Sequence, residues 1–323
     1  MLAGVVLAVI SGVVWYSRTV AVRRQEPVVH IGYLPIYVDL PLFVAVDRGY
    51  FDRHNVRYDL VRFASSPEIG NSLVQGDIQI GASIAYTVVL ATESRDPGKL
   101  RVFIVDSENK ENYLSSIVVL EKSGIKTLAD LRGKKVASFP GPTAVTFCKM
   151  VLEKYGFKPG EDVFVTELDV ASHLSALESG LVDALFTYEP TATQAVVEKH
   201  AVKLLPGAVE TEIMSPWQAG VWVVSTKFAA EHPSEARDTM AALYEAIDFI
   251  RQNPDEAKQS LKKFTSISEQ VAKQTPNIPF AKLSEVNLEA FQQQADILLQ
   301  RNVISKKIYA PVLLAPEQWV TGK

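Results

Sequence analysis

The stretch HIGYLPIYVDLPLFVAVDRGYFDRHNVRYDLVRFASSPEIGNSLVQGDIQIGAS, residues 30–83, decides the fold. An apolar run rich in β-branched residues ends at Pro35, and apolar residues then recur at helical spacing until Gly49. An alternating strand and a helix that closes at Gly76 follow, and the stretch ends on another apolar strand. Strands that alternate with helices predict an α/β fold with a parallel sheet covered by helices on its faces.

The same rhythm runs on through the chain and restarts once. A further strand covers 100–107, the pattern restarts at Ser115, and strands and helices then alternate up to about Trp217. One more strand, 221–226, precedes a tail that reads as wholly helical. The chain is therefore expected to cross twice between two β/α lobes, with one lobe inserted in the other. The predicted boundaries are 28–115 plus 221–323 for one lobe and 116–220 for the inserted lobe.

Composition excludes several classes of function. The chain has 323 residues, of which 47% are apolar and 22% charged, so it can bury a core and is long enough for two domains. Its 33 Lys and Arg against 37 Asp and Glu leave no basic excess, which argues against nucleic acid as a partner. The single cysteine, Cys148, excludes an internal disulfide framework and a multi-thiolate metal site, and it reads as a thiol packed on a helix.

Signatures of catalysis and of metal binding are missing from the sequence. There is no P-loop, no G-x-G-x-x-G after a strand, no G-x-S-x-G elbow and no H-E-x-x-H. The five histidines lie far apart, none paired at i, i+4, so surface or capping roles are expected for them. We therefore predict no catalytic residue, no metal and no cofactor.

The amino terminus indicates export. Residues 2–16 carry no charge, and the run is shorter than the roughly 20 residues that a membrane-spanning helix needs, which suits the core of a signal peptide. Thr19 and Ala21 stand where a cleavage site would have small residues. Arg18 follows the apolar run, opposite to the usual charge bias, and no cysteine stands near enough for a lipid anchor. We expect residues 1–21 to be a cleaved signal peptide or a retained anchor that contacts the membrane; a buried core helix is the remaining alternative.

The junctions between strands and helices concentrate small, hydroxyl and aromatic side chains. Open α/β sheets bind ligands beyond the carboxyl ends of their strands, where the first turns of helices present unpaired N–H groups. Two such sheets that face each other would form a cleft. The alternative is that Ser65, Ser83 and Thr143 merely cap helices. The five junctions are 34–39, 64–67, 82–86, 139–143 and 187–190.

At these junctions the chain resembles the periplasmic solute-binding proteins of the nitrate/sulfonate/taurine group, including relatives that bind the pyrimidine precursor of thiamine. The matching stretches are residues 30–83, SGIKTLADLRGKKVASFPGPTA at 123–144 and ALESGLVDALFTYEP at 176–190. The resemblance implies a type II periplasmic binding protein: two β/α lobes with a double crossover and a helical C-terminal tail. It also implies a monomer that closes on a small solute and delivers it to an ABC permease and its ATPase.

The resemblance also implies which residues contact the ligand. By position these are Tyr37, Ser65, Ser83, Thr143 and Glu189. Further candidates are added because of their own chemistry. Most of them stand at the same junctions, and one aromatic residue stands before the strand at 221–226. These are Asp39, Ser66, Tyr86, Gly141, Tyr188 and Trp217.

The class of solute stays open at this stage. Asp39 and Glu189 would repel a sulfonate but suit an amine or amidine, with a ring stacked on a tyrosine or on Trp217, which favours an amino-heterocycle. Against this, Glu189 precedes Pro190 and can equally be a carboxylate at a helix start, aimed at the amides of its own helix. The aromatic residues can equally belong to the core between domains.

The expected function is binding and not catalysis. The chain is predicted to be the extracytoplasmic component of an ABC importer that traps a sulfonate-like or nitrate-like anion, or an amino-pyrimidine, between its lobes. The alternative is a small-molecule enzyme, such as a lyase or a dehydratase, because one fold can host several activities.

Overall fold

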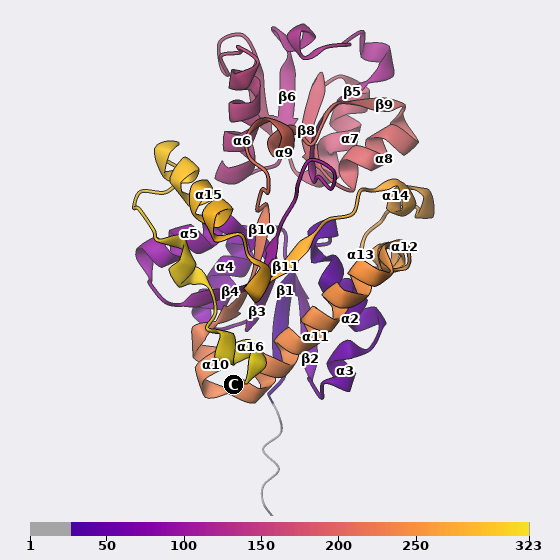
Figure 1. Cartoon of the computed structure of the whole chain (residues 1–323). Coiled ribbons are helices and arrows are strands. Elements are labelled where there is room, and N and C mark those ends of the chain that lie inside the picture. Colours follow the sequence, from indigo (N-terminus) through magenta and orange to yellow (C-terminus); the bar gives the residue numbers. More distant parts are fainter. Residues whose placement is uncertain (1–26, 323) are drawn as a thin grey trace, which may run out of the picture.

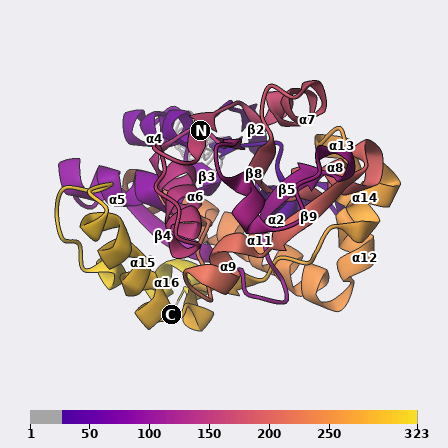
Figure 2. The same ribbon diagram turned by 90° about the horizontal axis from the view of Figure 1, so that it is seen from above.

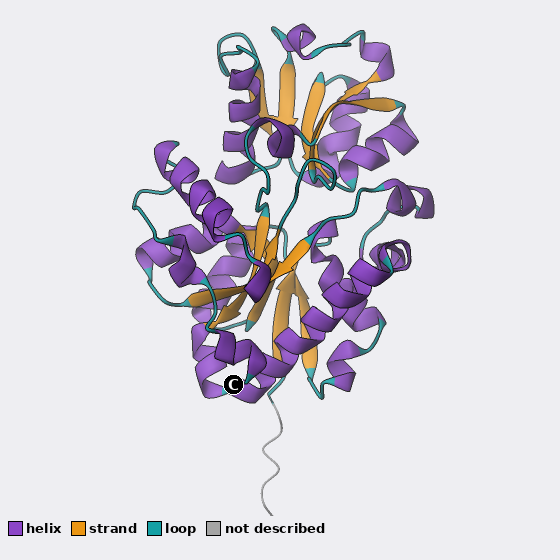
Figure 3. Ribbon diagram, viewed as in Figure 1, coloured by secondary structure: helices purple, strands orange, loops and turns teal. Residues whose placement is uncertain are grey.

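The structure is a computed structural model that describes residues 27–322. Two β-sheets lie one above the other, each flanked by helices, and loops connect them (Figures 1 and 3). The predicted signal peptide or anchor, residues 1–21, lies outside the described residues. None of the helices in the described part combines the length and the apolar character that a membrane crossing requires.

The larger sheet has six strands in the order β11-β4-β10-β3-β1-β2. β1 runs parallel to β2 and β3, whereas β10 runs antiparallel to both of its neighbours, β3 and β4. The expectation of a wholly parallel sheet is therefore wrong, because β10 enters the sheet at the edge where β3 and β4 end. The strands are β1 (Val29–Tyr33), β2 (Tyr58–Arg62), β3 (Ile80–Ala85), β4 (Leu100–Asp106), β10 (Gly220–Ser225) and β11 (Phe280–Lys282).

The smaller sheet has five strands in the order β7-β6-β8-β5-β9. β6 is parallel to β7 and β8, and β5 is antiparallel to β8 and β9. β9 was not anticipated, because its six residues directly follow a helix and carry no turn signal of their own. The strands are β5 (Ser115–Leu120), β6 (Lys135–Ser138), β7 (Phe164–Glu167), β8 (Ala184–Tyr188) and β9 (Ala201–Pro206).

Helices cover both sheets. We call the six-stranded sheet and its helices lobe 1, and the five-stranded sheet and its helices lobe 2. Seen from above, α5 and α15 lie together on one side of the molecule, and α12, α13 and α14 on the other (Figure 2). The helices of lobe 1 are α2 (Leu40–Asp47), α3 (Tyr50–Arg53), α4 (Ser66–Gln75), α5 (Tyr86–Arg95), α10 (Thr226–Glu231), α11 (Pro233–Gln252), α12 (Pro254–Ala257), α13 (Leu261–Phe264), α14 (Glu269–Gln274), α15 (Leu288–Gln300) and α16 (Glu317–Thr321). Those of lobe 2 are α6 (Pro142–Lys154), α7 (Val170–Ser179), α8 (Thr191–Lys199) and α9 (Ala208–Glu212).

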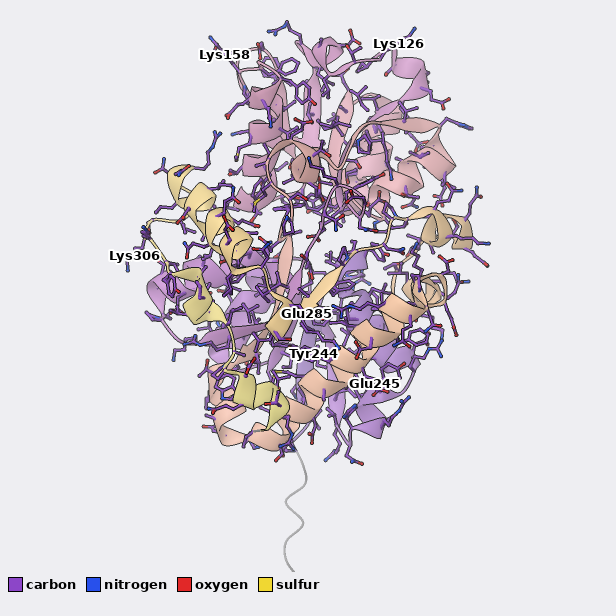
Figure 4. The ribbon with its side chains drawn as sticks, viewed as in Figure 1. Lys126, Lys158, Tyr244, Glu245, Glu285 and Lys306 are labelled. Carbon is purple, nitrogen blue, oxygen red and sulfur yellow. The ribbon has the colours of Figure 1, made fainter. Side chains whose placement is uncertain are left out.

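The C-terminal tail is helical apart from one strand. The apolar stripe of α11 buries Met240, Leu243 and Ile247, as its spacing predicts. Tyr244, labelled in Figure 4, donates a hydrogen bond to the carbonyl of Phe103 on β4 over 2.7 Å, which attaches α11 to the sheet. The expectation of a wholly helical tail is wrong at β11, since its three residues are too few to show an alternating pattern.

Two segments of chain, 107–114 and 213–219, connect the lobes, so the predicted double crossover is present. They pair with each other: the N–H of Glu108 donates to the carbonyl of Trp217 over 3.0 Å, and the N–H of Trp217 donates to the carbonyl of Glu108 over 2.8 Å. A short antiparallel ribbon therefore joins the lobes. One contiguous buried apolar cluster includes residues of both sheets, for example Val223 and Phe186.

Candidate functional site

The strand ends of the two lobes face each other across the ribbon. β4 leaves lobe 1 at Asp106, and β5 enters lobe 2 at Ser115, so the edges at which β1, β3 and β4 end lie toward lobe 2 (Figure 1). Lys126 and Lys158 project at the opposite end of lobe 2 (Figure 4). Two surface hollows, of about 350 and 530 Å³, lie elsewhere on lobe 1 and contain none of the predicted site residues.

Asp39 lies at the lobe-1 edge, at the end of a short 3-10 helix, η1 (Tyr37–Asp39). It is fully buried, and its Oδ2 accepts a hydrogen bond from the N–H of Leu34 over 2.7 Å. Its Oδ1 is buried without a hydrogen-bond partner. Burial raises the pKa of Asp39 well above its usual value, and the charge of Asp106 raises it further. Leu34 directly follows β1, which pairs with β3, so this hydrogen bond holds Asp39 beside the end of β3.

Ser83 and Asp106 form the next part of this edge. Ser83 is buried with a φ of +27°, and its hydroxyl donates to Oδ2 of Asp106 over 2.5 Å. Oδ1 of Asp106 is buried without a partner. Burial raises the pKa of Asp106 to about 7, against the lowering effect of the Ser83 hydroxyl and of the Trp222 indole. That indole N–H lies beside Asp106, yet the pair falls outside hydrogen-bond geometry.

Gly220, the first residue of β10, packs against this pair. A Cβ at this position would overlap the hydroxyl of Ser83 and would lie 2.6 Å from Oδ2 of Asp106. Only glycine lets β10 approach this closely. Sequence reasoning missed Asp106 and Gly220, although both are signalled weakly: an aspartate that ends an apolar strand, and a glycine where the second crossover enters the sheet.

Two buried glutamates hold the ribbon itself. Oε2 of Glu108 accepts from the N–H of Ala219 over 3.3 Å, which spans the two crossovers. Glu210 accepts from the N–H groups of Leu114 and Ser115, at 2.7 and 3.1 Å, and from the Ser115 hydroxyl at 2.5 Å. Burial raises the pKa of both carboxyls. The connection between the lobes is thus attached to α9 by side-chain hydrogen bonds.

Glu189 lies at the lobe-2 edge and is fully engaged by its own lobe. Its Oε1 is 2.5 Å from Nζ of Lys203 on β9, and its Oε2 accepts from the N–H of Thr193 in the first turn of α8 over 3.0 Å. This is the helix-start arrangement that the sequence left open. Tyr37 of lobe 1 lies close by: burial raises the pKa of its phenol, and the negative charge of Glu189 raises it further.

Aromatic rings surround the lobe-2 edge. Tyr188 stacks on Phe139 at 4.6 Å between ring centroids and lies 5.7 Å from Trp217. Trp217 is fully buried, and its Nε1 has no hydrogen-bond partner. Tyr86 lies apart from this group, because its ring stacks on Phe291 at 4.4 Å and its hydroxyl donates to the carbonyl of Phe291 over 3.2 Å.

The remaining predicted residues lie at the first turns of α4 and α6. Ser65 precedes α4 without a capping hydrogen bond, and the Ser66 hydroxyl accepts from the N–H of Ala85 over 3.1 Å. Gly141 precedes α6 with a φ of +105°, and its N–H donates to Glu167 over 2.7 Å.

Thr143 of α6 hydrogen-bonds Thr87 of α5 at 2.5 Å between hydroxyl oxygens, which links the two lobes directly. The structure therefore holds Asp39 beside the end of β3, which carries Ser83, and it packs Tyr188 near Trp217. Their role as ligand contacts stays a prediction.

Metal chemistry finds no support in the part of the chain that the structure describes. No group of three or more histidine, cysteine, aspartate or glutamate side chains within residues 27–322 has the geometry to hold a metal ion. Cys148 is a buried free thiol on α6, and burial raises its pKa, so it is an inert packed side chain.

Comparison with known proteins places this fold among binding proteins and one enzyme. A Bacillus subtilis (strain 168) protein named for binding aliphatic sulfonates is 26% identical over 276 residues, which cover 83% of this chain and 80% of the relative. The ligand-binding component of an ABC-type import system from Staphylococcus aureus, solved with zinc bound, superposes with a TM-score of 0.73 at 18% identity, over 91% of this chain and 98% of that one. The desulfurization enzyme DszB superposes with a TM-score of 0.67 at 16% identity, over 90% and 97%.

Superposition on solved periplasmic sulfonate-binding and nitrate-binding proteins confirms the type II periplasmic binding protein fold that the sequence predicted. The family follows from the sequence itself. The model of the NMT1/THI5-like family matches residues 38–257, about two thirds of the chain. The chain therefore belongs to the NMT1/THI5-like family.

Proposed function

We propose that this chain is the extracytoplasmic solute-binding component of an ABC importer and that it captures one small organic solute between lobe 1 and lobe 2. The observation that carries the proposal is the pair of opposed strand edges joined by a two-segment ribbon. Such a connection lets two rigid lobes rotate about a few backbone bonds. A solute that touches both edges then favours the closed state through its differential contacts.

The relatives support binding over catalysis. The Bacillus relative is named for binding and the Staphylococcus neighbour for import, whereas DszB shows that the same fold can carry an enzyme. A small-molecule enzyme is therefore the second candidate. By the same reasoning we propose an ABC permease and its ATPase as partners, a periplasmic or other extracytoplasmic location, and residues 1–21 as a signal peptide or membrane anchor.

The lobe boundaries 28–115 plus 221–323 and 116–220 are part of the proposal, as are the predicted ligand contacts. Tyr37, Ser83 and Thr143 lie at the facing edges with the geometry given above. Tyr86 is the weakest candidate, because Phe291 already occupies both its ring face and its hydroxyl.

The test is a thermal-shift screen of the purified chain with alkanesulfonates, taurine, nitrate and amino-pyrimidines, followed by calorimetry on each hit. We expect at least one solute to raise the melting temperature and to be recovered chemically unchanged by mass spectrometry. Recovery of a product would support the enzyme, and a panel without a hit would count against capture of these solutes.

A further inference from the structure

Four neighbouring strands bring polar groups to one place on the lobe-1 edge. In the sheet order β4, β10, β3, β1, the edge positions are Asp106, Gly220 and Ser83, and Asp39 of η1 is held at the end of β1 by its hydrogen bond to Leu34. The serine is locked to one carboxylate by a 2.5 Å hydrogen bond, and the glycine leaves room for both groups. Residues distant in sequence thus build a single polar spot.

The two carboxylates of this spot carry no protein cation. Asp39 and Asp106 are both 0% exposed, and neither forms an ion pair with a Lys, Arg or His of residues 27–322. A buried carboxylate without a partner is unfavourable by several kcal/mol after relaxation, so such groups are normally paired or protonated. Glu189 at the opposite edge follows the usual rule, because Lys203 neutralises it.

Each carboxylate keeps one oxygen for another group. Oδ2 of Asp39 is taken by the N–H of Leu34, and Oδ2 of Asp106 by the Ser83 hydroxyl. Both Oδ1 atoms are fully buried and unpartnered. The unpartnered indole of Trp222 also lies beside Asp106 and adds an aromatic side chain to the spot. The hydrogen bonds to the Oδ2 atoms fix the orientation of both carboxylates, and the two Oδ1 atoms remain able to accept hydrogen bonds from a ligand.

The chemistry that fits two such acceptors is a positively charged nitrogen group. An ammonium or amidinium supplies both the charge and several N–H donors, and an aromatic neighbour favours it further. A bound cation favours the ionised form of both carboxyls, whereas a sulfonate or a nitrate would meet two like charges once they are ionised. A metal ion is unsuited, because the described residues offer no third ligand to it.

We propose that Asp39 and Asp106 form one cation subsite, which accepts an ammonium or amidinium group of the bound solute, with Ser83 as a positioning residue for Asp106. This subsite rests on the proposed solute-binding function and narrows its substrate class. An anionic group elsewhere on the same solute is compatible with this subsite, because the subsite contacts only the nitrogen group.

The experiment uses matched probes that differ in that group alone: taurine against ethanesulfonate, and benzamidine against benzamide. Calorimetry on the full chain is expected to show that the cationic member binds roughly 10- to 100-fold more tightly, the loss typical of one charge-assisted hydrogen-bonded contact. Asp39→Asn and Asp106→Asn should abolish that preference while leaving the neutral or anionic partner within about threefold. Asp59→Asn on β2, whose carboxylate is largely exposed, is the matched control and should change nothing.

The outcomes separate the two proposals. Equal binding of both members of each pair by the unmodified chain overturns the cation subsite and leaves solute binding intact. A preference that survives both asparagine variants overturns the assignment to these residues. Failure of all four probes to bind, while a solute without a nitrogen cation binds in the thermal-shift screen, overturns the subsite and leaves the proposed function intact. Because the probe pairs are compared on the unmodified chain, the test does not depend on the folding of any variant.

Discussion

The two facing edges both carry buried carboxylates near the ends of strands, but these carboxylates have different partners in the two lobes. Glu189 in lobe 2 has both oxygens occupied, one by Lys203 and one by an α8 amide. Asp39 and Asp106 in lobe 1 have one occupied oxygen each and no cation. The partners of a carboxylate near a strand end therefore decide whether it stabilises the fold or can still contact a solute. Its position in the sequence does not reveal those partners.

The largest expected effect is a change of folding stability with pH, caused by the buried carboxyls of lobe 1. The pKa of Asp106 is raised by burial from 3.8 to about 7, so between these values the folded state holds a proton that the unfolded state has released. Folding stability should then fall as pH rises from about 4 to about 7, by up to about 1.4 kcal/mol per pH unit for one proton. Asp39 and Glu108, whose pKa values are also raised, act with the same sign.

Urea denaturation at several pH values measures this slope. Asp106→Asn should flatten it. An identical slope in the unmodified chain and in Asp106→Asn would show that this carboxyl does not hold a proton in the folded state.

Glu189→Gln removes the ion pair between Glu189 and Lys203 at the lobe-2 edge. It leaves the ammonium of Lys203, a mostly buried side chain, without its counter-charge, and the free energy of unfolding should drop by roughly 3 kcal/mol. Chemical denaturation gives the value, and the double variant Glu189→Gln with Lys203→Met should recover much of it. Stability equal to that of the unmodified chain would mean that the pair is not formed.

Gly220→Ala tests the close approach at the unpaired edge. The added Cβ overlaps the Ser83 hydroxyl, so we expect a loss of roughly 2 kcal/mol in stability and displacement of the Ser83–Asp106 hydrogen bond. Adding Ser83→Gly removes the overlapping hydroxyl and suits the positive φ, so it should restore part of the loss. If Gly220→Ala leaves the stability unchanged, β10 must lie farther from β3 than it does in this structure.

Asp39→Asn should have the opposite sign to Glu189→Gln. The amide oxygen can still accept the N–H of Leu34, and the chain no longer has to protonate this side chain when it folds at neutral pH, so the ligand-free chain should gain about 1 kcal/mol in stability. Thermal denaturation without ligand measures it. A destabilised Asp39→Asn would indicate that the carboxylate has a partner in the folded chain.

The smallest effect concerns contacts between the lobes outside both edges. Arg301, directly after α15, lies 2.7 Å from Glu153 of α6, and both side chains are about 40% exposed. Removing it by Arg301→Ala should weaken solute affinity by about twofold through a less favoured closed state. Arg95→Ala, which breaks an exposed pair within lobe 1, is the control. Dissociation rates from stopped flow should rise for the first variant and not for the second.

Much of the architecture could be predicted from local patterns. The strands from β1 to β8 and most helices between them follow from the period of apolar residues and from helix-ending glycines such as Gly76, which adopts a φ of +90°, whereas α3, directly after Gly49, was not anticipated. β9 could not be predicted because it follows α8 almost directly, and β11 because it has only three residues; each pairs with a strand distant in sequence, β5 or β4. The antiparallel direction of β10 likewise depends on where the second crossover enters the sheet.

The candidate site, like the fold, has features that the sequence determines and features that depend on the tertiary structure. The sequence by itself determined that polar residues gather at strand ends on two lobes linked by a double crossover, because strand ends and helix starts are local features. Only the tertiary structure decided which carboxylates are neutralised. Lys203 reaches Glu189 through β9, and Asp106 meets Ser83 across β10, contacts that depend on strand order and burial. Electrostatic partners in a folded chain are chosen by distance in space, which no local pattern encodes.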